Sequence, residues 1–165
     1  MREQSVRPWV WFALLLLAAL GCHRAPRVPD APTAWVTDQA GILAPTTVQV
    51  LDTQLKDYQD KTGHQVIVWT DRALPKGMSI EAFGLLAFNE WGIGREGHDD
   101  GVALFVFADP RLLRIQVGYG LERKLSDAEC ARIIGEVIVP RMQRGEPDAA
   151  MVEGVAAMLA ALGAP

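Results

Sequence analysis

Residues Trp91 to Phe107, WGIGREGHDDGVALFVF, join a glycine-rich loop to the most apolar internal segment of the folded part of the chain. The loop ends on two adjacent acids, Asp99 and Asp100, and the uncharged run VALFVFA follows at Val102–Ala108. A short, continuous apolar run is typical of a strand that is buried on both faces of a sheet. We therefore predict a central strand here, inside an α/β fold, with both carboxylates at its amino end.

Helical and strand patterns alternate on both sides of this segment. Apolar side chains recur at helical spacing after Pro45, Ser79, Ser126 and Pro147, and the helix after Ser126 is expected to end before Pro140. Further strands are predicted at 65–70 and 112–118. A strand–helix–strand unit joins parallel strands through a right-handed crossover. The order therefore predicts a single three-layer α/β/α sandwich with a small mixed sheet.

This topology brings two glycine-rich loops to the same end of the sheet. Parallel strands beginning near Gln65 and Val102 share their amino end, and the strand at 112–118, running the other way, finishes there. We expect His64, the loop 92–101 and the loop Gly118–Gly120 to converge at that end, with Asp71 and Asp109 at the opposite end.

The carboxylates at this end suggest a hard cation. Adjacent aspartates on an extended segment point apart, so one lines a pocket directly while the other binds a second ion or backbone amides. Calcium takes six to eight oxygen ligands, and glycines let loop carbonyls turn toward it. Glu96, His98 and His64 are possible outer neighbours of such a site. An acid before glycine is also ordinary turn chemistry, so a purely structural role stays open.

The amino-terminal residues resemble a bacterial lipoprotein signal. Arginines precede the apolar run Trp9–Leu20, which is too short to span a bilayer, and Gly21-Cys22 follows. We predict a signal peptide over residues 1–21, lipidation of Cys22, a Pro-rich extended tether over 22–34 and one domain over 35–165. An uncleaved anchor is the alternative. The expected location is the cell envelope, on the membrane surface facing the periplasm or exterior, and the outer membrane in a diderm host.

Charge and cysteine content narrow the classes of partner and chemistry. The formal net charge is −4 and no basic cluster is present, which argues against nucleic acid as a partner. Cys130 is the second of two cysteines, so lipidation of Cys22 leaves it without a disulfide partner. We expect Cys130 on the inner face of a helix as a small hydrophobic residue.

Three ordered stretches resemble the TPM domain family: AWVTDQAGIL, WGIG…HDDGVALFVF…DPRLLRIQVGYGLERKLSD, and IIGEVIVPRMQRGEPDAAMVEGVAAM. That family includes a thylakoid-lumen protein of photosystem II repair and many bacterial envelope proteins. The resemblance extends from Trp35 to Leu162. It implies helices on both sides of the sheet and a bound divalent cation, mainly calcium; some members are weak acid phosphatases and others lack catalysis.

The acids that match the family pattern are Asp38, Asp99 and Asp100, which the resemblance implies as metal ligands. Asp38 precedes the first helix, whose start is expected at the far end of the sheet from Asp100. Either the segment before Pro45 crosses back, or Asp38 belongs to a separate turn.

Three functions are compatible with these patterns. The first is a non-catalytic, calcium-binding accessory protein on a lipid anchor, which supports assembly or quality control of a membrane complex with an unidentified envelope protein. The second is a weak metal-dependent acid phosphatase, in which Arg95 and Arg123 contact phosphoryl oxygens. The third is an ion-free interaction module, with Trp35, Trp91 and Tyr119 lining a groove.

Overall fold

A four-stranded mixed sheet forms the centre of the domain, and the computed structural model describes residues 27–163. The strand order is β1–β2–β3–β4, with β1 parallel to β2, β2 parallel to β3, and β3 antiparallel to β4. The strands are β1 (Val36–Asp38), β2 (Gln65–Asp71), β3 (Gly101–Phe107) and β4 (Leu112–Val117). The α/β fold class and the parallel pairing of β2 with β3 are confirmed.

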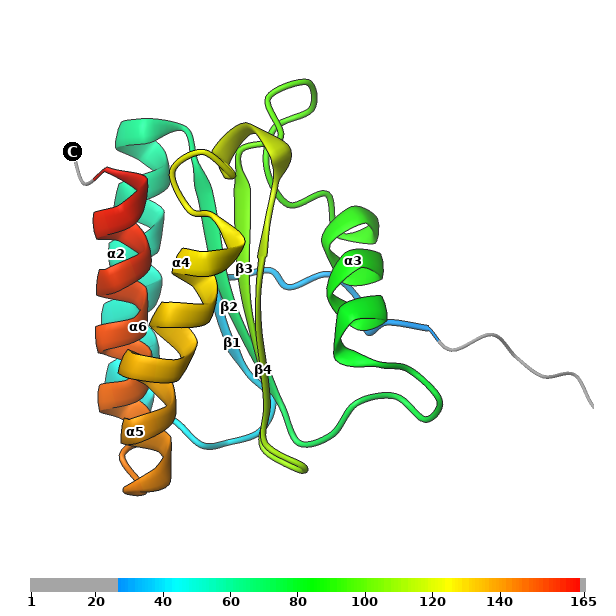
Figure 1. Ribbon diagram of the computed structural model, residues 1–165, viewed down its shortest axis with the longest axis vertical. Coiled ribbons are helices and arrows are strands. Elements are labelled where there is room, and N and C mark those ends of the chain that lie inside the picture. The colour runs from blue at the N-terminus through cyan, green and yellow to red at the C-terminus, as the bar shows by residue number, and fades with distance from the viewer. Residues whose placement is uncertain (1–26, 164–165) are drawn as a thin grey trace, which may run out of the picture.

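Helices cover both faces of the sheet, which gives the predicted three layers (Figure 1). In the described part of the chain, one face is covered by α2, α6 and the helical stretch α4–η3–α5, and the other by α3 alone. The helices are α2 (Pro45–Thr62), α3 (Ile80–Glu90), η2 (Tyr119–Leu121), α4 (Asp127–Arg132), η3 (Ile133–Ile138), α5 (Val139–Gln143) and α6 (Pro147–Leu162).

Burial on both faces of β3 follows from side chains that alternate between two cores. Val102, Leu104 and Val106 pack among the α2, α4 and α6 side chains, whereas Phe105 and Phe107 pack under α3. All seven residues of β3 are buried. The continuous apolar run is therefore needed, because neither face of this strand contacts water.

Local signals set most helix ends as predicted. The Ser79 and Ser126 side chains each accept a hydrogen bond from the backbone N–H three residues later, as N-caps do. Gly63 ends α2 in the left-handed region, with φ of 78°. Cys130 is buried in α4 and packs in the larger core, as expected of a small hydrophobic residue.

Two elements differ from the sequence prediction. The three-residue strand β1 was not expected, and it forms by pairing with the edge of β2. The third helix was expected to end before Pro140 but continues to Gln143. Its backbone widens to π geometry over Ile133–Ile138, and the N–H of Val139 bonds to the carbonyl of Ile134. Proline has no N–H and crowds the preceding turn, and the wider ladder accommodates it.

The described part of the Pro-rich segment lies against the domain beside α3. The indole Nε1 of Trp91 donates to the carbonyl of Pro29 at 2.9 Å, and Val28 packs against the smaller core. Within residues 27–163 no helix is long and apolar enough to cross a bilayer. The predicted signal peptide and Cys22 lie outside the described residues.

Candidate functional site

The two glycine-rich loops meet at the amino end of the parallel strands, as the topology predicted. The N–H of Gly120 donates to the carbonyl of Asp99 at 3.1 Å, and the N–H of Gly118 donates to that of Gly101 at 2.9 Å. The N–H of Gln65 bonds to the carbonyl of Asp100 at 3.1 Å. At the opposite end, the N–H of Ala108 bonds to the carbonyl of Asp71 at 2.9 Å.

Two glycines permit the close approach of these loops. A Cβ atom on Gly118 would lie 2.2 Å from the carbonyl oxygen of Asp99, and one on Gly120 would lie 2.1 Å from that of His98. Any side chain at either position would displace backbone rather than a flexible group. The Gly-Tyr-Gly loop therefore packs directly against the carbonyls that precede Asp100.

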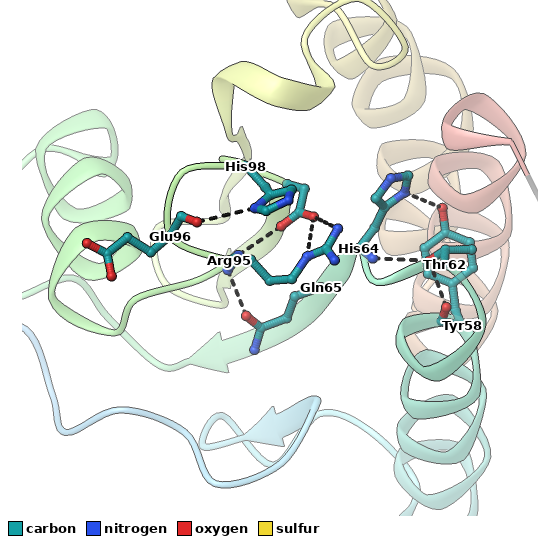
Figure 2. Close-up of polar contacts among 9 residues, drawn as sticks. Tyr58, Thr62, His64, Gln65, Arg95, Glu96 and His98 are labelled. Carbon is teal, nitrogen blue, oxygen red and sulfur yellow. Dashed lines mark hydrogen bonds and ion pairs between the residues drawn. The ribbon is translucent and has the colours of Figure 1, made fainter.

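Asp100 is the buried acid of this end, with 4% of its surface exposed. Its Oδ1 accepts the backbone N–H of Arg95 at 2.8 Å, and its Oδ2 accepts Nε of Arg95 at 2.7 Å. A terminal guanidinium nitrogen of Arg95 also bonds to Oδ2. The Gln65 side chain holds the same loop, because its Oε1 accepts the N–H of Gly94 at 2.7 Å (Figure 2).

The hydrogen bonds from Arg95 control the protonation of Asp100. Burial alone raises the pKa of this carboxyl group, but the side-chain and backbone hydrogen bonds from Arg95, with its charge, together outweigh burial. The net result is a pKa below the ordinary aspartate value. Asp100 is therefore ionised at neutral pH although it is buried.

This lowered pKa predicts an acid-dependent loss of stability. The unfolded state binds a proton at Asp100 more readily than the folded state does, so stability falls as the pH drops through the folded pKa. Below about pH 4, the free energy of unfolding of the wild type should decline more steeply than that of Asp100→Asn. Urea unfolding across pH measures this. Asp109→Asn, at the exposed opposite end, should follow the wild type, and parallel curves for wild type and Asp100→Asn would contradict the prediction.

The other predicted residues of this loop point into solvent. Asp99 is exposed and has φ of 50°, a left-handed conformation that aspartate tolerates better than most residues. Asp99 and Asp100 therefore do point apart. Glu96 extends its carboxylate away from Arg95, and its backbone carbonyl contacts Nδ1 of His98 at 3.2 Å (Figure 2).

His64 turns toward α2 rather than toward the carboxylates. Its Nδ1 lies 3.3 Å from the hydroxyl of Tyr58 (Figure 2). Burial, followed by the charge of Lys124, lowers the pKa of His64 against the opposing effect of Asp100. The imidazole is therefore mostly neutral at neutral pH and contributes no positive charge to the site.

Asp38 lies at the other end of the sheet and is not brought together with Asp99 and Asp100. It ends β1 and pairs with Thr70 of β2, whereas Gly101 pairs with Gln65 of β2. Thr70 lies five residue steps beyond Gln65, so about 17 Å of strand separates the level of Asp38 from that of Gly101. Its carboxylate accepts backbone N–H bonds from Gly41, Ile42 and Leu43 at 3.0, 3.2 and 2.8 Å, and the Thr70 hydroxyl. The segment before Pro45 does not cross back, and Asp38 holds the turn into α2.

Sequence reasoning missed the role of Arg95. It named Arg95 only as a contact for phosphoryl oxygens, whereas the structure pairs its side chain and backbone with Asp100. The available signal was the five-residue spacing within one glycine-rich loop, which lets the chain fold back on itself. Loop conformation, not periodicity, determines such a pair.

The atoms at this end that could bind a metal are oxygens, which hard cations prefer, but they are few. Among residues 27–163 no group of three or more His, Cys, Asp or Glu side chains is placed to hold a metal. The oxygens available are the carboxylates of Asp99 and Asp100 and the carbonyls that face Gly118 and Gly120. A cation, the guanidinium of Arg95, already lies against Oδ2 of Asp100. With Asp100 already paired and Asp99 facing solvent, these residues form only a partial ligand set, and an oxygen-preferring ion here would keep several waters.

Nucleophilic chemistry finds little support among the described residues. Burial raises the pKa of the Cys130 thiol to about 11, so its thiolate is scarce. The Ser79 and Ser126 hydroxyls are engaged as N-caps. His64 contacts the phenol of Tyr58, whose pKa is raised by burial.

Comparison with known proteins agrees with this architecture. The TPM domain model matches residues 36–161. The solution structure of the N-terminal domain of a protein from P. gingivalis is 31% identical, with a TM-score of 0.72 over 79% of this chain and 82% of that chain.

Two more distant structures share the fold. The N-terminal domain of the cg2496 protein from Corynebacterium glutamicum is 14% identical, with a TM-score of 0.61 over 83% of this chain and 85% of that chain. The BA42 protein from Bizionia argentinensis is 16% identical, with a TM-score of 0.61 over 73% and 81%. Among curated proteins no significant relative is found. Because the family model spans the sheet and the covering helices, the chain belongs to the TPM domain family.

Proposed function

We propose that this TPM domain is a lipid-anchored, non-catalytic accessory module of the cell envelope that binds a divalent cation, calcium, at the amino end of its sheet. The observation that carries the proposal is the buried, ionised Asp100 between two glycine-rich loops. A carboxylate removed from water needs a cationic partner, and here that partner is a single half-exposed guanidinium.

Because Asp99 and Asp100 point apart, one of these two side chains would hold the ion, with loop carbonyls and water completing its ligands. When bound, the cation supplies positive charge that links the two loops and orders them. Asp38 is excluded from this ligand set because it ends β1 at the opposite end of the sheet and its carboxylate accepts the backbone N–H groups of its own turn. Glu96 and His98 are exposed neighbours on the loop.

A lipid on Cys22 is supported by the apolar run that ends at Gly21-Cys22. The described chain begins at Arg27, and Pro29 is already held by Trp91. Few residues therefore separate the proposed lipid from the domain, which would keep the domain near the membrane and beside envelope proteins.

A weak phosphatase is the less supported reading. It needs a cationic group free to meet phosphoryl oxygens, and Arg95 is engaged by Asp100. It also needs a metal that activates water strongly, which calcium does poorly compared with zinc. The ion-free interaction module has one specific observation in its favour, because Tyr119 is 81% exposed on the loop beside the site.

Calcium titration of the full chain in detergent tests the proposed function. We expect millimolar calcium to raise the melting temperature of the wild type in a concentration-dependent way, since the ion binds the folded state. Asp100→Asn should abolish the rise, and Asp109→Asn, which removes the same charge at the opposite end, should preserve it. Fractionation of the same preparations tests the lipid anchor: the wild type should be recovered with the membranes, and Cys22→Ser should be recovered outside them. Equal calcium responses in wild type and Asp100→Asn, or none, would reject the ion site and leave the interaction module.

A further inference from the structure

A cavity of about 220 Å³ lies at the end of the sheet opposite to Asp100. Its walls come from the carboxyl end of β3, the β3–β4 turn, the β1–α2 connection, α5 and the start of α6, which meet at the lower end of the domain in Figure 1. None of its described lining residues belongs to the proposed cation site. It is therefore a separate feature of the molecule, and its occupancy would not require an ion.

Apolar side chains from four separate segments line this cavity. They are Ile42 of the β1–α2 connection, Leu113 of β4, Met142 of α5 and Pro147 in the first turn of α6. Ile42, Leu113 and Met142 are half-buried and pack against the larger core. A group that entered the cavity would therefore cover apolar surface that folding leaves in contact with water.

Arg111 is the charged residue that lines the cavity. The described arginines that form ion pairs are Arg95, Arg132, Arg141 and Arg144. The exposed side chain of Arg111 is thus in no ion pair with residues 27–163. Of the nearby acids, Glu146 is bound by two of those arginines, Asp148 accepts a backbone N–H of the β1–α2 connection, and Asp109 does not line the cavity. The cavity is therefore complementary to an apolar group that carries a negative charge.

The backbone conformation of Arg111 also indicates a role beyond the turn. Arg111 ends the four-residue connection between β3 and β4 with φ of 66°, in the left-handed region that favours glycine. Among the described residues other than glycine, only Asp99 shares a positive φ. Glycine would close this turn with less strain, so turn closure alone does not explain an arginine. Residues held in such conformations are concentrated at functional sites.

The size of the cavity limits its occupant to about one large apolar side chain. Drug-sized ligands occupy pockets of roughly 300 to 1,000 Å³, whereas a cavity of about 150 Å³ holds benzene. The volume here suits a leucine or phenylalanine side chain and is too small for a membrane acyl chain. The negative charge must also be close to that side chain. Neighbouring side chains of an extended peptide point to opposite faces, but a terminal carboxylate is bonded to the same Cα atom.

We propose that this cavity binds the carboxyl terminus of a partner polypeptide that ends in a large apolar residue. The apolar side chain fills the cavity, and the terminal carboxylate pairs with the guanidinium of Arg111. A large side chain in such a pocket is the kind of contact that supplies most of the binding energy of an interface.

Peptide titrations of the full chain in lipid nanodiscs test this proposal, with methyl NMR of Ile42 and Met142 as the readout. N-acetyl-Gly-Gly-Phe with a free carboxylate should shift both methyl resonances. We expect its carboxyl-terminal amide to bind about tenfold more weakly, because it lacks the charge-assisted contact with Arg111. N-acetyl-Gly-Gly-Ala has the carboxylate but little apolar surface, and it should also bind about tenfold more weakly or worse.

Arg111→Gly separates the proposed role from turn closure. Glycine adopts φ of 66° freely, so the melting temperature should be no lower than that of the wild type. The affinities for the acid and the amide should become equal to within about twofold, because the cation is gone. Arg123→Gln is the control. It removes the same charge from an exposed position beyond η2, at the other end of the sheet, and should keep the roughly tenfold preference for the acid.

The wild type alone can overturn the proposal. Equal affinity for the acid and the amide, or shifts confined to residues away from the cavity, would do so, as would an unchanged preference for the acid in Arg111→Gly. Dodecanoate is the lipid probe. If dodecanoate shifted the Ile42 and Met142 methyl resonances and the phenylalanine peptide did not, the cavity would belong to an acyl chain and the polypeptide partner would be rejected. These outcomes are independent of the calcium titration, which reports on the opposite end of the sheet.

Discussion

Replacing Phe83 by alanine is expected to lower the free energy of unfolding by about 4 kcal/mol. Phe83 is fully buried and is the centre of the core under α3. Its ring packs edge-on against Phe105 and Phe107, with centroid distances of 5.3 and 4.9 Å, and against Trp91 at 6.2 Å. Among residues 27–163, α3 is the one helix on this face, so no neighbouring helix in the described part of the chain can move in to fill the cavity (Figure 1).

Urea unfolding measures this loss as a lower midpoint with little change in slope. Leu85→Ala is the control on the same helix, since Leu85 is 56% exposed and its truncation should cost less than about 1 kcal/mol. A similar, small loss in both variants would show that α3 packs loosely. That result would contradict the assignment of Phe83 as the anchor of this layer.

Replacing Gly118 by alanine is expected to cost about 3 kcal/mol and to disturb the loop that carries Asp100. The added Cβ atom would meet the carbonyl oxygen of Asp99 at 2.2 Å, and that oxygen belongs to backbone that cannot rotate away alone. The φ angle of Gly118 is −74°, which alanine adopts freely, so the cost comes from the clash and not from backbone strain.

Amide NMR of residues 98–101, together with urea unfolding, separates the two effects of Gly118→Ala. Gly135→Ala is the matched control, because nothing lies within 4 Å of its added Cβ atom. It is expected to be neutral or stabilising by about 0.5 kcal/mol, since alanine favours helical backbone over glycine. Unchanged loop resonances in Gly118→Ala would mean that the two loops do not depend on each other.

The three acids first considered together have three different environments. Asp38 accepts only neutral donors and fastens a turn, Asp100 is buried and paired with an arginine, and Asp99 faces solvent. The same residue type thus serves as turn anchor, buried counter-ion and free carboxylate. Of these, Asp99 and Asp100 lie at the amino end of the parallel strands, where cation binding is proposed.

Local patterns were sufficient for the main elements. Helical spacing with a proline in the first turn predicted α2 and α6, and helical spacing with an N-cap serine predicted α3. Apolar runs predicted β2 and β3, because all these signals lie within ten to twenty neighbouring residues. Strand direction then predicted which loops share an end of the sheet. The loop 92–101 and the Gly118–Gly120 loop meet where that argument put them.

Tertiary contacts decided the remaining features. Strand β1 is three residues long and exists because β2 offers it an edge, and π geometry carries the third helix past Pro140 because α4–η3–α5 packs on the sheet and α6. One irregular loop folds over the end of β3, and its conformation determines which aspartate is buried. The same conformation brings Arg95 to Asp100. Hydrophobic periodicity predicts which side of a helix or strand is buried. Residues at the ends of the sheet come from segments that are distant in the sequence, so their contacts depend on how the strands pair.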